Sequence, residues 1–296
     1  MIDAFLQLSL TALSLGSAYA LTALGFVLVI NAVGAVNFAH GEAVMIGGFV
    51  AVGVAAFLPT ELLFPGLLAL PAVLILMAGV GAAIALLGYF PLKNAPPVSI
   101  FISTIAIGLM FQHGATLIAG PEPQAGPALL GAGQLRVFDL ILPRQQLATI
   151  IVGILLVLLT HLLLHATRFG RQLRAAAQDR EMARAIGIPV TLTTLASFAL
   201  ASALAGAAGL MLSNQYFVTP TDGGLLMLKA YMATVIGGWG RVWGAAFGAL
   251  LIAVFETLLA AWVSYLAAEA LLYIAVLLIL AFKPEGLFGE AEGARA

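Results

Sequence analysis

Few side chains in this sequence could do chemistry, and those few stand alone in apolar surroundings. Glu256 lies near the middle of the apolar stretch Val242–Ser264, and Asn37-Phe38-Ala39-His40-Gly41-Glu42 interrupts an earlier apolar pattern. Asn37 and His40 would share a face if that segment is helical. An ionisable group at membrane depth costs about 2.5 to 3.5 kcal/mol and is a functional candidate for that reason. The candidates are therefore Asn37, His40, Glu42 and Glu256.

Each of these groups also has a structural interpretation. The segment that contains His40 could be a hydrated turn at the cytoplasmic membrane interface. From spacing alone, this structural interpretation and the functional one carry equal weight. Glu256 could form a helix–helix hydrogen bond in its protonated form, which is favoured over a substrate contact. Lys229 follows the turn Thr-Pro-Thr-Asp-Gly-Gly, and we expect it to extend to the external surface or to pair with Asp222.

Catalytic and metal-binding chemistry is not indicated. His113, His161 and His165 are isolated, without the grouping of histidines and carboxylates that a metal site needs. The sequence contains no GxxxxGK[ST] phosphate loop, no GxSxG elbow, no HExxH motif and no cysteine. We expect no catalytic residue, no metal and no cofactor, so this chain is not expected to be an enzyme. If transport is active, the energy must enter through another protein.

The amino-acid composition predicts which kind of structure must position these groups. Apolar residues make up 62% of the 296 positions and charged residues 8%, against about 25% charged in an average soluble domain. The net charge of −1 removes the basic surface that nucleic-acid binding needs. The sequence is that of an integral membrane protein in contact with lipid. Six intervals without Asp, Glu, Lys or Arg can each hold one crossing: 4–39, 43–60, 62–92, 94–121, 145–167 and 185–221.

Two more crossings fit into Val242–Phe282, joined near Ser264–Ala268. Leu225–Gly238 is too short for a full span and predicts a half-helix or a broken one. The alternation of a membrane β-strand is absent. We therefore predict an all-α polytopic helical bundle with eight full or nearly full spans and one short segment. Residues 1–296 form a single transmembrane domain in this interpretation.

Arginine and lysine predict the orientation. Five of the twelve positive charges fall between Arg168 and Arg184, and the positive-inside bias places them in the cytoplasm. Lys93 lies two crossings earlier, on the same side. The N-terminus is then external and the C-terminus cytoplasmic. The loop 120–144 is external and rich in Gly and Pro, which favours an irregular connection.

Small residues spaced four apart form ridges on several predicted helices. Such ridges let helix backbones approach closely in lipid. Packing inside one subunit is favoured over a dimer interface. The three ridges are Ala12, Gly16 and Ala20; Ala201, Ala205 and Gly209; and Gly240, Gly244 and Gly248.

The charged segment 168–189 is the most informative part outside the spans. Ala175–Ile186 contains good helix formers, and Gly187 followed by Pro189 indicates a helix end. The segment could be a charged loop that only fixes the topology. We favour docking to a cytoplasmic partner.

Four stretches together resemble the LivH-like permease subunits of branched-chain amino acid ABC importers. They occur in the order and spacing of that family over nearly the whole length, although Arg241 stands where many relatives have a small polar residue. The stretches are GSAYALTALGFVLV with NFAHGE in 16–42, GRQLRAAAQDREMARAIGI, KAYMATVIGGWGRVWGAAFGALLIAVFE in 229–256, and KPEGLFG in 283–289.

The resemblance implies that 175–188 is the cytoplasmic coupling helix, which inserts into a groove of an ATPase subunit. Its candidate residues are Ala175, Asp179, Arg180, Met182, Ala183 and Gly187. The implied partners are a second permease of LivH or LivM type, two cytoplasmic ATPase subunits and an extracytoplasmic solute-binding protein. The implied location is the bacterial inner membrane.

Other functions stay open at this point. The family also includes permeases for urea, short amides and other carboxylates. From another class, an autonomous channel or secondary transporter would use intramembrane ionisable groups, of which few are present. An intramembrane enzyme is a weaker alternative, because the sequence shows no paired catalytic groups at suitable spacing.

Overall fold

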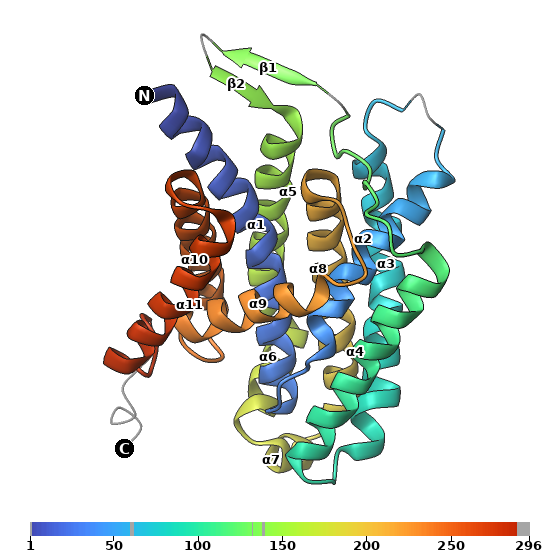
Figure 1. Cartoon of the computed structure of the whole chain (residues 1–296). Helices are drawn as coiled ribbons and strands as arrows, with labels where there is room; N and C mark the ends of the chain where they lie inside the picture. Colours follow the sequence, from blue (N-terminus) through green and yellow to red (C-terminus); the bar gives the residue numbers. More distant parts are fainter. Residues whose placement is uncertain (1, 60–61, 132, 138–139, 289–296) are drawn as a thin grey trace.

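The computed structural model describes residues 2–59, 62–131, 133–137 and 140–288. Within these residues it is a bundle of helices, eight of which are long and apolar enough to cross a membrane (Figure 1). The predicted eight spans are confirmed. They are α1 Ile2–Val33, α2 Ala39–Ala56, α3 Pro65–Ile84, α4 Pro97–Ala119, α5 Arg144–Ala166, α8 Val190–Tyr216, α10 Val242–Trp262 and α11 Tyr265–Phe282.

Shorter elements connect these spans. The predicted short segment is present as α9, and α10 and α11 are joined at Ser264, whose Oγ accepts a hydrogen bond from the backbone N–H of Ala267 at 3.3 Å. The shorter elements are α6 Arg168–Gln178, α7 Arg180–Ala185, α9 Gly223–Gly237, the π-turn η1 Ala85–Tyr89, the 3₁₀ turn η2 Phe90–Leu92, and the strands β1 Gln134–Val137 and β2 Leu140–Pro143.

The centre of the bundle is formed by α1 and α8, which are the most buried of the spans. Phe26 of α1 and Phe198 of α8 are among the largest side chains that are fully enclosed. Spans α4 and α11 are the least buried and expose side chains such as Ile118 and Leu277. Lipid tails solvate such surfaces without penalty, so these helices form the outside of the bundle.

Glycines let the central helices approach at backbone distance. A Cβ atom added to Gly47 of α2 would lie 2.5 Å from Cα of Gly206 in α8. A Cβ on Gly16 of α1 would lie 2.8 Å from Cδ1 of Leu250 in α10. The predicted ridge residue Gly209 likewise faces the carbonyl oxygen of Val44. These small residues therefore serve packing inside one subunit.

Helix α9 differs from the others because it lies across the bundle rather than along it (Figure 1). It follows a connection that begins at Phe217, whose φ of 62° is unusual for a residue with a side chain. Val218 is held in an antiparallel bridge to Gln124, with N–O distances of 2.8 and 3.0 Å. The loop after α4 thereby fixes the start of α9.

The two ends of the bundle carry different elements. The hairpin β1–β2 lies at the end where α1 begins, whereas α6 and α7 lie at the opposite end, near the turn between α3 and α4 (Figure 1). The loop 120–144 was expected to be irregular, and in this part the expectation was wrong. Gln134 pairs with Pro143 and Leu135 with Leu142 in the hairpin. A ladder satisfies backbone groups that an irregular loop leaves to water.

Candidate functional site

The segment that begins α2 lies inside the bundle. The backbone N–H of Phe38 donates to Oγ1 of Thr104 at 3.2 Å, and Nε2 of His40 lies 2.9 Å from the carbonyl oxygen of Thr22. Thr104 is seven residues into α4 and Thr22 eleven residues before the end of α1. At about 1.5 Å of rise per residue, these contacts lie roughly 10 and 16 Å inside the two helix ends.

Asn37 and His40 both have structural contacts there. Oδ1 of Asn37 accepts from the backbone N–H of Ala39 at 3.1 Å, so Asn37 precedes the helix and does not share a helical face with His40. His40 is 1% exposed and packs against Gly25 of α1. His40 thus holds the start of α2 against α1, whereas the Asn37 side chain bonds within its own segment.

Glu42 is half-buried between α4 and α9. A Cβ added to Gly108 would lie 3.3 Å from its Cγ, and one added to Gly223 would overlap its carboxylate. Oε2 of Glu42 is buried without a hydrogen-bond partner among the described residues. Gly223 is the first residue of α9, where the helix dipole favours a negative charge. The carboxylate of Glu42 thus faces the N-terminus of α9.

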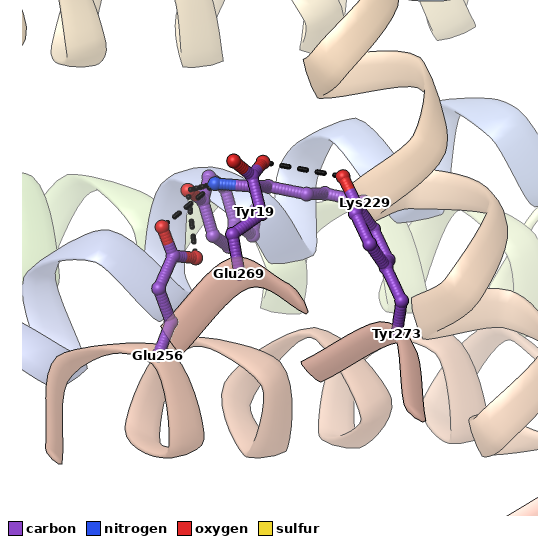
Figure 2. Close-up of polar contacts among 5 residues, drawn as sticks. All are labelled: Tyr19, Lys229, Glu256, Glu269 and Tyr273. Carbon is purple, nitrogen blue, oxygen red and sulfur yellow. Dashed lines mark hydrogen bonds and ion pairs between the residues drawn. The ribbon is translucent and has the colours of Figure 1, made fainter. Parts of the chain in front are cut away.

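Glu256 forms a buried ion pair with Lys229. Nζ of Lys229 lies 2.7 Å from Oε1 of Glu256 and donates to the hydroxyl oxygen of Tyr19 at 2.8 Å. The hydroxyl of Tyr19 in turn donates to Oε2 of Glu256 at 3.3 Å (Figure 2). Three helices, α1, α9 and α10, are joined by this cluster.

The prediction for Lys229 was wrong. Its side chain is 6% exposed and pairs with Glu256 instead of reaching the surface or Asp222. Asp222 accepts from the backbone N–H and the hydroxyl of Thr219, at 2.7 and 2.6 Å. Because α9 crosses the bundle, Lys229 in its second turn points into the core, which the length of the segment alone does not reveal.

Removing one member of the pair leaves a buried charge without compensation, which costs about 3 to 5 kcal/mol. The nearby Glu269 has a separate partner, since it accepts from the hydroxyl of Tyr273 at 3.2 Å (Figure 2). Both of these residues belong to α11. The Lys229–Glu256 pair is therefore a connection between helices, whereas Glu269 and Tyr273 bond within one helix.

A cavity of about 630 Å³ borders this ion pair. Its lining comes from the N-terminal part of α1, from α2, from the last turns of α8 and α10, from the N-terminal half of α9 and from the start of α11. Lys229 and Glu256 are on its wall together with Asp222. The lining parts of α1, α8 and α10 lie toward the hairpin end of the bundle, and α9 crosses the bundle between them and the end with α6 and α7 (Figure 1).

The sequence candidates separate into two places. Glu256 lines the cavity, whereas Asn37, His40 and Glu42 lie outside its lining. His161 and His165 stack on one another at 3.9 Å between ring centroids, and His161 also contacts Trp243. In the part of the chain that the structure describes, no three His, Asp or Glu side chains are grouped as a metal site would require.

The segment 168–189 is built as two helices. The sequence predicted one helix over Ala175–Ile186, but Asp179 is extended, with φ −152° and ψ 112°. Its Oδ1 accepts from the backbone N–H groups of Glu181 and Met182, both at 2.9 Å. Asp179 thus caps α7 and ends α6, and this competing N-cap breaks the predicted helix. Gly187 has φ +83°, as expected for the residue that ends such a helix.

The coupling candidates face different ways within this segment. Ala183 is buried against Ala176 and Val190, whereas Met182 and Ile186 are 61% and 68% exposed. Ala175 is half-buried on α6, where its carbonyl accepts from the backbone N–H of Asp179 at 3.1 Å. The exposed side of α7 therefore carries the apolar Met182 and Ile186 beside the charged Glu181 and Arg184.

Arg180 binds α7 to the rest of the bundle. Its Nη1 donates to the hydroxyl of Tyr89 at 2.7 Å, and its Nη2 donates to the carbonyl oxygen of Ala32. Ala32 lies in the last turn of α1, where the carbonyl groups favour a cation, and Tyr89 ends η1. One side chain thereby joins three elements.

Comparison with known proteins identifies the family of this chain. The family described as branched-chain amino acid transport system / permease component matches residues 8–281. The chain belongs to this family. The permease is 30% identical over 297 residues to the high-affinity branched-chain amino acid transport system permease protein LivH of Escherichia coli strain K12. This alignment covers 97% of this chain and 96% of the relative.

Two other relatives agree with this assignment. The permease protein BraD of Pseudomonas aeruginosa strain PAO1 is 30% identical over 302 residues, covering 97% of each chain. A protein of Methanocaldococcus jannaschii described as a probable LivH permease is 30% identical over 257 residues, covering 81% of this chain and 76% of the relative. No solved structure matches the chain. With its eight apolar helices, this permease is a multi-pass protein of the inner membrane.

Sequence reasoning missed two parts of this permease site, the role of Tyr19 and the pairing of Lys229. A signal for the pairing was present, because Lys229 and Glu256 are opposite charges in neighbouring apolar segments. Such groups inside a membrane pair with one another as a rule. Tyr19 gave no comparable signal, since a tyrosine in an apolar helix is common at an interface.

Proposed function

We propose that this permease is the transmembrane subunit of an ATP-driven ABC importer. It pairs with a second permease of LivH or LivM type and two cytoplasmic ATPase subunits. An extracytoplasmic binding protein delivers a branched-chain amino acid or a related small solute to it. Family membership and the described roles of LivH and BraD support the cargo and the transport role.

The orientation follows from charge. The end of the bundle with α6 and α7 carries five arginines between Arg168 and Arg184, and we place it in the cytoplasm. The hairpin end and the N-terminus are then external, and so is the cavity above α9. The C-terminus is cytoplasmic; residues 289–296, where the KPEGLFG stretch ends, lie outside the described residues.

The observation that carries the proposal is the structure of the segment 168–189, in particular its exposed side chains and its contacts with the bundle. Its apolar Met182 and Ile186 are exposed at the cytoplasmic end, while Arg180 ties the same short helix to α1 and η1. Exposed apolar side chains such as these two suit a partner groove, and a rigid connection to the core transmits displacement. Docking of this segment to an ATPase is supported by both features.

Transport then requires two states of the bundle. In this structure α9 lies between the cavity and the end with α6 and α7, and we assign it the role of the closed barrier. Closure of the ATPase dimer moves α7, and through Arg180 it moves the end of α1. ATP thereby biases a two-state element, as any ligand with different affinity for two conformations does.

The test uses the complete importer. In the variant Met182→Glu/Ile186→Glu, docking loses its apolar anchors and gains charge, so ATPase affinity falls by about 2 kcal/mol or roughly thirtyfold. Co-purification of the ATPase and ATP-dependent leucine uptake into proteoliposomes measure this. The control Asn94→Asp adds charge to an exposed residue of the turn before α4, outside the segment 168–189, and leaves both unchanged. Full ATPase binding and uptake in the double variant would contradict the coupling role.

Two further experiments separate the competing functions. Competition of leucine uptake by urea, short amides and simple carboxylates tests the cargo, since the family includes permeases for such solutes. Uptake by this chain alone, without ATP or partners, would instead establish an autonomous channel or secondary transporter.

A further inference from the structure

The cavity above α9 has the form of a small-molecule site. Its volume of about 630 Å³ falls inside the range of roughly 300 to 1,000 Å³ that such sites occupy. The walls are mainly aliphatic, with Leu15 from α1, Val44 and Met45 from α2, and Leu226 from α9. A few polar groups converge on the same space, which is how binding sites fix orientation.

The charged groups on the wall have both signs. Among the described residues that line the cavity, the charged side chains are Lys229, Glu256 and Asp222. Lys229 contacts two oxygen atoms, those of Tyr19 and Glu256, and an ammonium group has three donors. A carboxylate that enters the cavity can therefore be bound by Lys229, while the two acidic groups accept from a cation.

Packing alone does not demand this ion pair. Apolar residues of similar volume stabilise a core as well as a buried pair or better, because two charges must lose their water. The pair instead places an ammonium and a carboxylate 2.7 Å apart on the wall of a mainly apolar cavity. Opposite charges at that spacing complement a molecule that itself carries both.

We propose that this cavity binds a zwitterionic α-amino acid in transit, with Lys229 holding its carboxylate, Glu256 and Asp222 its ammonium, and the aliphatic walls its side chain. The inference rests on the proposed function and names the cargo class at one site within it. A simple carboxylate would meet two acidic groups and one cation, and urea or a short amide offers no charge that separates the pair. The cavity therefore favours an amino acid over these other cargoes.

The sequence contains no cysteine, which permits a direct test. Thr257→Cys places one thiol on the cavity wall of the complete importer, whose other subunits are made cysteine-free. Leucine at about ten times its dissociation constant should slow maleimide labelling of this thiol about tenfold. 4-Methylpentanoate, which lacks the ammonium, and 3-methylbutylamine, which lacks the carboxylate, should not slow it.

Two controls isolate the charged pair. Labelling of Gln134→Cys, exposed on the hairpin, should not respond to leucine. In Thr257→Cys combined with Lys229→Met/Glu256→Met, leucine should no longer protect. If this triple variant fails to assemble, the comparison of the three ligands on Thr257→Cys alone decides.

The outcomes are distinguishable from those of the proposed function. Equal protection by all three ligands, no protection by leucine, or protection that survives in the triple variant would overturn the site while the importer still takes up leucine. Absence of leucine uptake by the unmodified importer would instead overturn the proposed function.

Discussion

Arg180 shows how much one side chain can decide in a bundle with few charges. It donates to the Tyr89 hydroxyl and the Ala32 carbonyl, and so connects α7 to η1 and the end of α1. The sequence marked Arg180 as part of a docking segment. Its partners could not be predicted, because both lie across the fold, 91 and 148 residues away along the chain.

Replacement of Arg180 tests this connection. Arg180→Gln removes charged hydrogen bonds and should lower the stability of the purified permease by about 1.5 kcal/mol. The matched control Arg184→Gln changes an exposed arginine of the same helix and should have little effect. Thermal unfolding in detergent measures both. Equal midpoints for the two variants would mean that Arg180 does not hold α7.

The ion pair of Lys229 and Glu256 gives a second residue-scale prediction. Glu256→Gln alone leaves Lys229 buried without its counter-charge and should destabilise the permease by about 3 kcal/mol. Combining it with Lys229→Met removes the uncompensated charge and should restore most of that loss. A double-mutant cycle from thermal unfolding measures the coupling; additive effects would show that the two groups act independently.

At the scale of elements, helix ends were harder to predict than helices. The prediction of one helix over Ala175–Ile186 failed at Asp179 because its carboxylate caps α7. The hairpin at Gln134–Pro143 was missed because each strand has four residues, too few for a clear alternation signal, and Leu140–Leu142 is a continuous apolar run. The long spans were predicted because a charge inside lipid is costly, so intervals without charge mark them reliably.

The contact of α2 with α8 gives a prediction for elements. In Gly47→Ala the added methyl meets the backbone of Gly206 and must push the helices apart, which costs about 1 to 3 kcal/mol. Gly53→Ala, on the same helix but with open space around it, should be neutral or slightly stabilising. Thermal unfolding of the two variants compares them directly. Similar stability in both would exclude a backbone contact at Gly47.

For the whole molecule, the sequence predicted the features that depend on composition but not those that depend on long-range packing. Composition and the intervals without charge predicted the membrane class and the eight spans, since those depend on solvation alone. The cavity and the position of α9 across the bundle depend on how helices distant in sequence pack, and no local pattern encodes that. The structure shows which elements share an end of the bundle, and the charge bias then assigns each end to one side of the membrane.

Cysteine labelling tests that assignment. Gln134→Cys on the hairpin and Glu181→Cys on α7 each place a single exposed thiol at one end of a chain that has none of its own. A membrane-impermeant maleimide should label Gln134→Cys in intact spheroplasts, and Glu181→Cys only after lysis, because the positive-inside bias of five arginines between Arg168 and Arg184 predicts that end in the cytoplasm. The reverse pattern would put the cavity on the cytoplasmic side of α9 and remove the route from an external binding protein.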